Sequence, residues 1–406
     1  MQPHGLAKLE IPPDTVPQRN AVSGPVGISV KRLTLTDFRC YHHQRLDLDL
    51  GPVVLTGPNG AGKTNLLEGL SFLVPGRGLR RARLGDVVRR NPAAGASRSS
   101  PWGVAAVLRT PQGEVEIGTA YEAATEGGRD KRIVKVNGEI AKNQAVLAEH
   151  VSALWLTPQM DRLFLEGPGA RRRFLDRLVF DTDPAHAGRV NAYDHALRER
   201  MRLLRDGGAD ADWLSTLEDT MAKRGVAVAA ARLDVVRRLA RHLTGKRGAE
   251  GFPSAEIAAM GEIETWLGEG PALAAEDRFR DRLAAERGRD TTEGRGRIGP
   301  HRSDLAVRHL GNGEAAAVCS TGEQKALLVA LVLATARMRA DEQGTAPLLL
   351  LDEIAAHLDA RRLEALFDEI IRLGAQVWMT GTDAALFQSL TGRAQFFNVA
   401  DATVTH

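Results

Sequence analysis

The chain has 406 residues, a formal net charge of +3 and a pI of about 9.0. Hydrophobic residues make up 43% and charged residues 26%, which is ordinary for a soluble globular protein of two or three domains. The two cysteines, Cys40 and Cys319, offer neither a disulfide framework nor a metal-binding spacing, so a reduced, cytoplasmic setting fits. No segment approaches the ~20 apolar residues of a membrane span, and we expect no membrane-embedded part.

The first 27 residues contain five prolines and no apolar core of a secretory signal. We expect a disordered tail, or a start codon placed upstream of the natural one. From residue 28 the pattern changes to that of strands. ISVKRLTLTDF (28–38) and QRLDLDL (44–50) alternate apolar and polar residues, which predicts half-buried strands with Leu46, Leu48 and Leu50 on one face.

PVVLT (52–56) is a short continuous apolar run, as in a central strand buried on both faces. TNLLEGLSFLV (64–74) predicts a helix with Leu66, Leu67, Leu70 and Leu73 facing inward. Further strands are predicted over 102–110, 113–121 and 132–139. Residues 28–158 therefore form the first part of an α/β lobe.

A glycine-rich loop lies between that central strand and that helix. It matches G-x-x-x-x-G-K-[ST] in full, with a strand before it and a helix after it, as phosphate-binding loops require. Its backbone N–H groups and the helix N-terminus favour phosphate, Lys63 is expected to reach the β- and γ-phosphates, and Thr64 to bind Mg²⁺. The predicted ATP-binding residues are Gly57, Pro58, Asn59, Gly60, Ala61, Gly62, Lys63, Thr64 and Asn65.

The middle of the chain, residues 159–296, has apolar residues at steps of three and four from about Arg171 to Arg287, which predicts helices. The region is too short for extended coiled-coil arms. From residue 297 to 406 the α/β pattern returns. One α/β unit is thus expected to be split by a helical insertion.

LLLLDE (348–353) predicts a buried strand with Asp352 at its end, where the carboxylate can hold Mg²⁺. Glu353 is then placed to polarise an attacking water, which makes Glu353 and Lys63 the predicted catalytic residues. LTPQMD (156–161) offers Gln159 as a third Mg²⁺ ligand.

The segment STGEQKALLVALVLA (320–334) resembles the signature of ATP-binding-cassette ATPases. In that class the signature caps the γ-phosphate of ATP bound to the opposing subunit, at the N-terminus of a helix. Ser320 also suits a simple helix N-cap, and both roles are compatible. The predicted capping residues are Ser320, Thr321, Gly322, Glu323, Gln324 and Lys325.

Two further positions match the cassette pattern. Asp359 falls where that class carries the D-loop, which crosses the dimer interface. The switch histidine is missing, because Gly381 or Thr382 occupies its place. This absence favours slow hydrolysis.

The chain resembles the RecF family of the SMC/Rad50 class from residue 28 to about 400. The likeness rests on LTDFRCY, on GPNGAGKTNLLEGLSFLVPGRGLR and LTPQMDRLFLEGPGARRRFLDRL, and on GPHRSDL, STGEQKALL and LLLLDEIAAHLD. It implies an ATPase head with lobe I split into 28–158 and 297–406, a helical lobe II and no long coiled coil. It also implies an ATP-dependent, DNA-binding homodimer with weak, DNA-stimulated ATPase activity, which acts with RecO and RecR at single-/double-strand junctions to load RecA and support the SOS response.

A basic run follows the glycine loop. Arg77, Arg80, Arg81 and Arg83 are the candidate DNA-binding residues; Arg89 and Arg90 extend the run, and Asp86 alone opposes it. Such a run can follow phosphates, although a solvated basic loop has the same pattern. Arg171, Arg172 and Arg173 are a second candidate; on a helix they point in three directions, so at least one is expected to serve structure. Aromatic residues are only 5% of the chain and none interleaves with the basic run, which disfavours a base-stacking platform.

Two other functions stay open. An ATPase subunit of a membrane transporter would require a switch histidine and a surface for a membrane partner. A DNA clamp in which ATP serves mainly as interfacial glue would require only the paired motifs.

Overall fold

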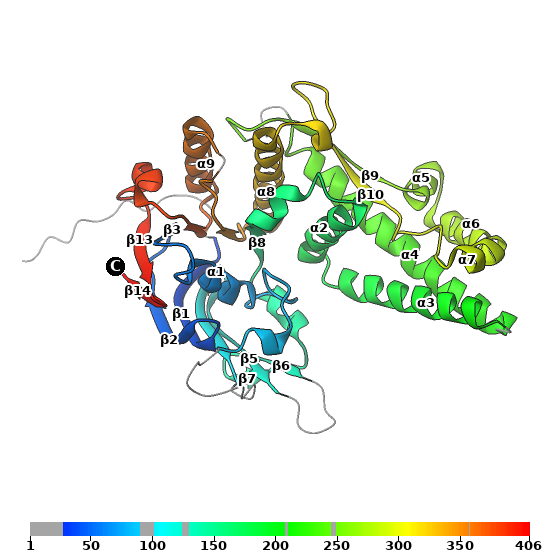
Figure 1. The fold of residues 1–406 in the computed structure, drawn as a ribbon, viewed down its shortest axis with the longest axis horizontal. Helices are drawn as coiled ribbons and strands as arrows, with labels where there is room; N and C mark the ends of the chain where they lie inside the picture. Colours follow the sequence, from blue (N-terminus) through cyan, green and yellow to red (C-terminus); the bar gives the residue numbers. More distant parts are fainter. Residues whose placement is uncertain (1–26, 90–100, 124–129, 208–209, 245–248, 357) are drawn as a thin grey trace, which may run out of the picture.

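The computed structural model contains two six-stranded sheets, a two-stranded sheet and a helical arm (Figure 1). It describes residues 27–89, 101–123, 130–207, 210–244, 249–356 and 358–406. The tail expected over residues 1–27 therefore lies, except for Gly27, outside the described residues. The strands are β1 (Ser29–Phe38), β2 (Tyr41–Asp47), β3 (Val53–Thr56), β4 (Gly103–Thr110), β5 (Gly113–Glu122), β6 (Lys131–Val136), β7 (Glu139–Ile140), β8 (Ala153–Leu156), β9 (Ala255–Met260), β10 (Asp304–His309), β11 (Leu348–Leu351), β12 (Val377–Thr380), β13 (Gln395–Ala400) and β14 (Thr403–Thr405). The helices are α1 (Lys63–Ser71), α2 (Pro168–Thr182), α3 (His186–Asp206), α4 (Ala211–Ala240), α5 (Glu262–Glu269), α6 (Ala272–Ala285), α7 (Arg287–Glu293), α8 (Thr321–Gln343) and α9 (Ala360–Leu373).

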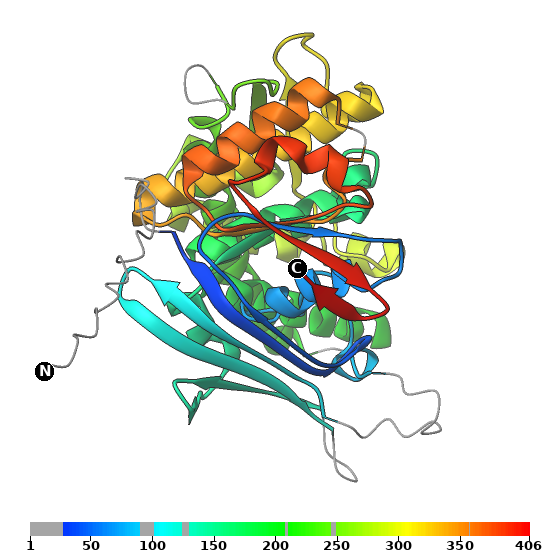
Figure 2. The same cartoon turned by 90° about the vertical axis from the view of Figure 1, so that its left-hand side faces the viewer.

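The mainly parallel sheet has the order β14-β13-β3-β12-β11-β8. Its central strands are the predicted apolar runs, and both of their faces are buried. In β11, Leu348 and Leu350 enter one hydrophobic core while Leu349 and Leu351 enter another, because successive side chains of a strand point to opposite faces. Helices α8 and α9 cover the second of these faces (Figures 1 and 2).

The antiparallel sheet has the order β2-β1-β4-β5-β6-β7 and faces the first core. Helix α1 lies between the two sheets, with Leu66, Leu67 and Leu70 fully buried against residues of β1 and β3, as the leucine spacing predicts. The prediction for 44–50 is wrong at its end, since Leu50 lies beyond β2 and is 54% exposed.

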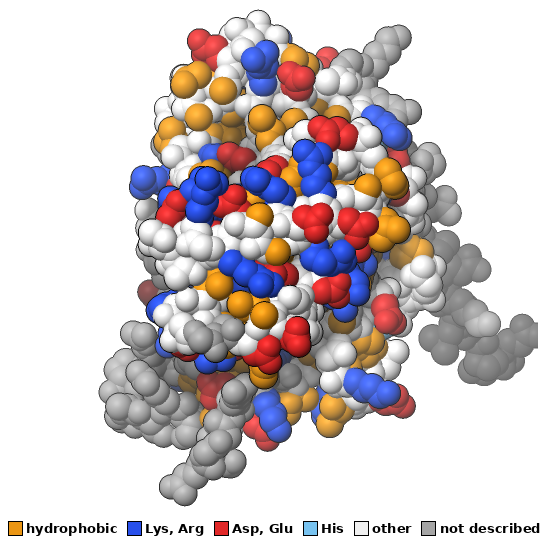
Figure 3. All heavy atoms as spheres, turned by 90° about the vertical axis from the view of Figure 1, so that its right-hand side faces the viewer, with side chains coloured by type: hydrophobic (Ala, Val, Ile, Leu, Met, Phe, Trp, Pro, Cys, Tyr) orange, Lys and Arg blue, Asp and Glu red, His pale blue; other side chains and the backbone are white. Residues whose placement is uncertain are grey.

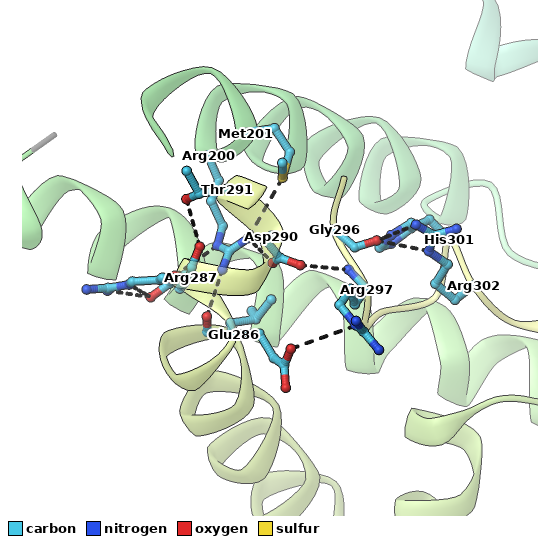
Figure 4. Close-up of polar contacts among 12 residues, drawn as sticks. Arg200, Met201, Glu286, Arg287, Asp290, Thr291, Gly296, Arg297, His301 and Arg302 are labelled. Atoms are coloured by element: carbon cyan, nitrogen blue, oxygen red, sulfur yellow. Dashed lines mark hydrogen bonds and ion pairs between the residues drawn. The ribbon is translucent and has the colours of Figure 1, made fainter. Parts of the chain in front are cut away.

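The helical arm, formed by α3 to α7, has its own small core around Tyr193, Phe279 and Trp266. Beside it lies a buried ion network (Figure 4). Arg200 is fully buried and donates to Glu218 at 2.8 Å, to Asp290 at 2.6 Å and to the Leu283 carbonyl at 2.7 Å. Buried charges are tolerated when they are paired and hydrogen-bonded in this way. The network joins α3, α4 and α7.

The expectation of helices throughout 171–287 is wrong for β9, which pairs antiparallel with β10. In β9 only Ala255 and Ile257 are buried, so its apolar alternation is too short to stand out among helical repeats. Two of the segments that carry the family resemblance meet at β10. Arg171 on α2 donates to both carboxylate oxygens of Asp304, at 2.7 and 2.8 Å, and Arg172 donates to the Ser303 carbonyl at 2.8 Å. The expectation that part of the Arg171–Arg173 run is structural is thus confirmed.

None of the helices in the described ranges is long and apolar enough to cross a membrane.

Candidate nucleotide site and family

The glycine-rich loop joins β3 to α1 at the carboxyl end of the parallel sheet. Gly57 has φ of 137°, and a β-carbon there would lie 2.1 Å from the Val399 carbonyl oxygen. Gly62, with φ of 119°, begins α1, and a β-carbon there would lie 2.6 Å from the Tyr41 hydroxyl. Both positions therefore require glycine. Pro58, Asn59 and Gly60 are exposed at the tip of the loop, whereas Ala61 and Gly62 are buried.

Lys63 lies folded over this loop. Its ammonium donates to the carbonyls of Gly57 at 2.6 Å and Pro58 at 2.8 Å, and the residue is only 5% exposed. Burial lowers the pKa of Lys63, while the negative charges of Glu353 and Asp352 act to raise it. The loop, the lysine and both acidic residues thus share one electrostatic environment.

A chain of hydrogen bonds links the start of α1 to the ends of β11 and β12. Thr64 donates to Asp352 at 2.9 Å, Thr380 donates to the same carboxylate oxygen at 2.8 Å, and the Glu353 amide donates to the Thr380 hydroxyl at 2.8 Å. Glu353 has φ of 49°, which is uncommon for a residue with a side chain and is typical of functional sites. Thr380 has no motif of its own; its position at the end of a central strand was the available signal.

The predicted Mg²⁺ ligands fit the ion's chemistry in part. A carboxylate and a threonine hydroxyl lie side by side, and hard oxygen donors suit Mg²⁺, which also retains waters and substrate phosphates. Within the described residues there is no group of three His, Cys, Asp or Glu side chains that could hold a metal by itself. Gln159 is exposed just beyond β8, whose Leu156 carbonyl accepts from the Asp352 amide at 2.9 Å. Gln159 thus lies at the same edge of the sheet as Thr64 and Asp352, but no hydrogen bond joins its side chain to theirs.

The predicted signature forms the start of α8. Ser320 is the N-cap and makes a capping box with Glu323, whose carboxylate accepts from the Ser320 amide at 2.9 Å. Ser320 and Thr321 are exposed, whereas Gln324 and Lys325 are buried. The Lys325 ammonium lies 3.4 Å from Asp161, in the segment that contains Gln159. The exposed start of the segment, rather than its buried end, is therefore available to a ligand.

Asp359 caps α9 by accepting from the Arg362 amide at 2.8 Å. An added β-carbon on Gly322 would lie 4.0 Å from the Arg362 guanidinium, so the starts of α8 and α9 are neighbours. The predicted signature and D-loop residues accordingly share one surface.

Gly381, one of the two positions that could have carried the switch histidine, has no room for a side chain. A β-carbon there would lie 2.5 Å from the Phe387 ring, whereas Thr382 is exposed. Packing thus excludes a side chain at Gly381.

The basic loop after α1 is partly committed to structure. Glu68, fully buried on α1, accepts from Arg39 at 2.8 and 2.6 Å and from Arg80 at 3.1 Å. Arg80 also donates to Asn65 at 2.9 Å, and the Asn65 amide contacts the Cys40 sulfur at 3.1 Å. Arg77, Arg80, Arg81 and Arg83 are all exposed, and only Arg80 is held by these hydrogen bonds. Arg90 lies outside the described residues.

Comparison with known proteins agrees with this geometry. The sequence profile of the RecF/RecN/SMC N-terminal domain matches residues 29–404. A Mesorhizobium japonicum protein named DNA replication and repair protein RecF is 49% identical over 382 residues, covering 94% of this chain and 98% of the relative. The chain belongs to the RecF family. A Brucella suis biovar 1 protein of the same name is 48% identical over 382 residues, covering 94% of this chain and 97% of the relative.

Solved structures show the same fold. A structure described as the recombination mediator protein RecF-ATPrS in the RecFOR pathway has a TM-score of 0.81 at 22% identity, and the match covers 94% of this chain and 98% of that one. A Pyrococcus furiosus Smc head domain has a TM-score of 0.52 at 15% identity, over 93% and 95% of the two chains. The expected α/β head of the SMC and cassette ATPase class, with a short helical insertion and no long coiled coil, is confirmed for this RecF-family chain.

Proposed function

We propose that this chain is an ATP-dependent, DNA-binding recombination mediator of the cytoplasm. It binds gapped DNA as an ATP-bound homodimer, acts with RecO and RecR to help load RecA, and supports gap repair and the SOS response. Hydrolysis of ATP to ADP and phosphate is slow, stimulated by DNA, and resets the dimer. The relatives named DNA replication and repair protein RecF support this role, since they match nearly the whole chain.

One observation carries the proposal: the glycine-rich loop is hydrogen-bonded to Asp352 through Thr64, and a signature-like helix start lies exposed on the same chain. The first arrangement suits the phosphates of ATP. The second suits the phosphates of ATP held by another subunit, because Ser320 and Thr321 leave the start of α8 open. Within the described residues no hydrogen bond or ion pair joins Gly57–Thr64 to Ser320–Lys325, which fits a role for the signature across a dimer.

The residues divide the chemistry between them. The loop amides and Lys63 orient the phosphates, and Thr64 and Asp352 are placed to hold Mg²⁺, which neutralises phosphate charge when bound. Glu353 orients the attacking water and accepts its proton. In the absence of a side chain at Gly381, the site lacks the histidine of fast cassette ATPases. A clamp in which ATP is mainly interfacial glue is therefore the second candidate, with turnover too slow to drive repeated work.

Sedimentation and nucleotide titration on one preparation test the proposal. The wild-type chain is expected to dimerise with ATP, and Ser320→Arg to remain monomeric, because a bulky cation replaces the small cap at an interfacial helix start. Monomer affinity for ATP should stay unchanged. Thr216→Arg, an equal change at an exposed position of α4, is the matched control and should dimerise normally.

Lys63→Met in the same assays is expected to abolish nucleotide binding. Near wild-type affinity in this variant would refute the nucleotide site. Normal dimerisation of Ser320→Arg, or its loss of monomer binding, would refute capping across the dimer.

A further inference from the structure

Three exposed arginines from two distant segments have no acidic partner among the described residues. Arg77 and Arg81 lie in the loop after α1, and Arg173 lies on α2. Within the described ranges, no carboxylate forms an ion pair with any of the three. Partial burial of the Arg81 guanidinium lowers its pKa, and the positive charges of Arg173 and Arg77 lower it further. The loop and α2 therefore bring positive charges within electrostatic reach of one another, and no acidic side chain of the described residues pairs with them.

Two arginines, Arg132 and Arg80, hold the loop after α1 in place. Arg132 is directed under it and donates to the carbonyls of Phe72, of Val74 at 3.3 Å and of Gly76 at 2.7 Å. Arg80 holds the side of the loop through Glu68 and Asn65. Rigid supports of this kind fix the free side chains in place before a ligand arrives.

Arg81 adds a strained backbone to this arrangement. Its φ is 54°, in the left-handed region, and its amide donates to the Gly78 carbonyl at 3.2 Å in a tight turn. Such a conformation costs about 1–3 kcal/mol and persists where the surroundings enforce it, frequently at binding sites. The turn therefore holds a charged residue in place at an energetic cost.

Arg173 is equally uncommitted on its own helix. Arg171 and Arg172 are used by Asp304 and the Ser303 carbonyl, whereas an added β-carbon on Gly169 would lie 3.4 Å from Arg173 Nη1. The guanidinium thus lies over the first turn of α2, which has no acidic residue and no side-chain cap. A cation at this positive end of a helix is unfavourable by itself and favourable once an anion joins it.

We propose that Arg77, Arg81 and Arg173 form one surface for the phosphate backbone of duplex DNA, spanning the loop after α1 and the start of α2. The proposal rests on the proposed DNA binding and assigns residues to it. It transfers the expected role of Arg80 to structure and adds Arg173. Proteins bind single strands largely by stacking bases on exposed aromatic side chains. Among the large apolar residues exposed in the described ranges, Trp213 is the only aromatic one, and it lies on α4 in the helical arm. Duplex is therefore favoured over single strands.

Two features distinguish this surface from the rest of the molecule. The loop packs on the core between the two sheets, and α2 on the core beyond the parallel sheet, so a bound backbone would link the two halves of the head. By contrast, the face at the helical end has Lys and Arg interspersed with Asp and Glu (Figure 3).

The test measures affinity of the full chain with ATP for a 30-base-pair duplex against salt. Each lost phosphate contact lowers the slope of log K against log salt by about 0.9. Arg81→Gln and Arg173→Gln should each lower it by about 0.9, and the triple variant with Arg77→Gln by about 2.7, with roughly 10²-fold weaker binding at 0.1 M salt. Arg205→Gln, at an exposed position near the end of α3, is the matched control. Nucleotide affinity and thermal unfolding of each variant check folding.

Different results would overturn the composite surface, the choice of duplex or the proposed function. An unchanged slope for Arg173→Gln would overturn the composite surface and leave only the loop. Equal effects of Arg173→Gln and Arg205→Gln would show a general charge effect and also overturn it. Tighter binding of a 30-nucleotide single strand, lost in the triple variant, would refute the choice of duplex. Failure of the wild-type chain to bind any DNA would refute the proposed function itself.

Discussion

His301, in the GPHRSDL segment, is expected to make the free energy of unfolding depend on pH, by an amount that follows from its burial. Its Nε2 lies 3.0 Å from the Gly296 carbonyl oxygen and its Nδ1 lies 2.7 Å from the Tyr193 hydroxyl. The carbonyl can only accept, so Nε2 carries the hydrogen and Nδ1 accepts from the tyrosine. Burial lowers the pKa of His301 from 6.5 to about 4, although the hydrogen bond to the Gly296 carbonyl acts to raise it, so the folded imidazole is neutral above pH 4.

The direction and the size of this pH dependence follow from proton linkage. Between pH 6.5 and 4 the unfolded chain binds a proton that the folded chain does not, so the free energy of unfolding falls as pH falls. With these two pKa values the loss is about 2 kcal/mol at pH 5 and approaches ~3.4 kcal/mol well below pH 4. Other carboxyl groups titrate nearby, and a variant is needed to isolate the histidine.

The assay is urea unfolding of the wild-type chain and of His301→Gln at pH 7.5, 6.0 and 5.0, followed by circular dichroism. Glutamine offers a neutral donor and acceptor at the same place, so the carboxyl contributions cancel in the difference. The wild type is expected to lose about 2 kcal/mol relative to the variant between pH 7.5 and 5.0. His195→Gln, at an exposed position of α3, leaves the buried site intact and should show a flat difference. A flat difference for His301→Gln as well would refute the neutral, buried histidine.

Three further predictions concern the nucleotide site and the loop after α1. Glu353→Gln should keep ATP binding and slow hydrolysis by roughly 10²-fold or more, measured as phosphate release, because a positioned base is lost; unchanged turnover would place the base elsewhere. Gly381→His should lower the melting temperature by several degrees, since Phe387 occupies the space, while Thr382→His should fold normally; equal stability of the two would contradict the packing. Arg80→Gln should destabilise the fold by about 0.5–1.5 kcal/mol in urea unfolding, because buried Glu68 loses one hydrogen bond and keeps those from Arg39; a neutral effect would return Arg80 to the free cations.

Much of the head could be predicted from the sequence because its signals are local. The apolar run 348–351 predicted a strand buried on both faces, and the leucines of α1 predicted its inward face. The loop from Gly57 to Thr64 is defined by glycine conformations and by its neighbouring strand and helix, all within about twenty residues. The short pairing of β9 with β10 was missed because a few alternating residues do not stand out against the helical repeats around them.

Only the tertiary structure decided which charges are free and which polar groups meet. The basic run reads as one unit in sequence, yet Arg80 is held by buried Glu68, while Arg81 is within electrostatic reach of Arg173 on α2. Thr380 joins Asp352 because parallel strands end at one edge of a sheet, although 28 positions separate them. Sequence specifies side-chain chemistry and local conformation; the pairing of distant groups depends on how sheets and helices pack, and that packing assigns each arginine either to the fold or to a ligand.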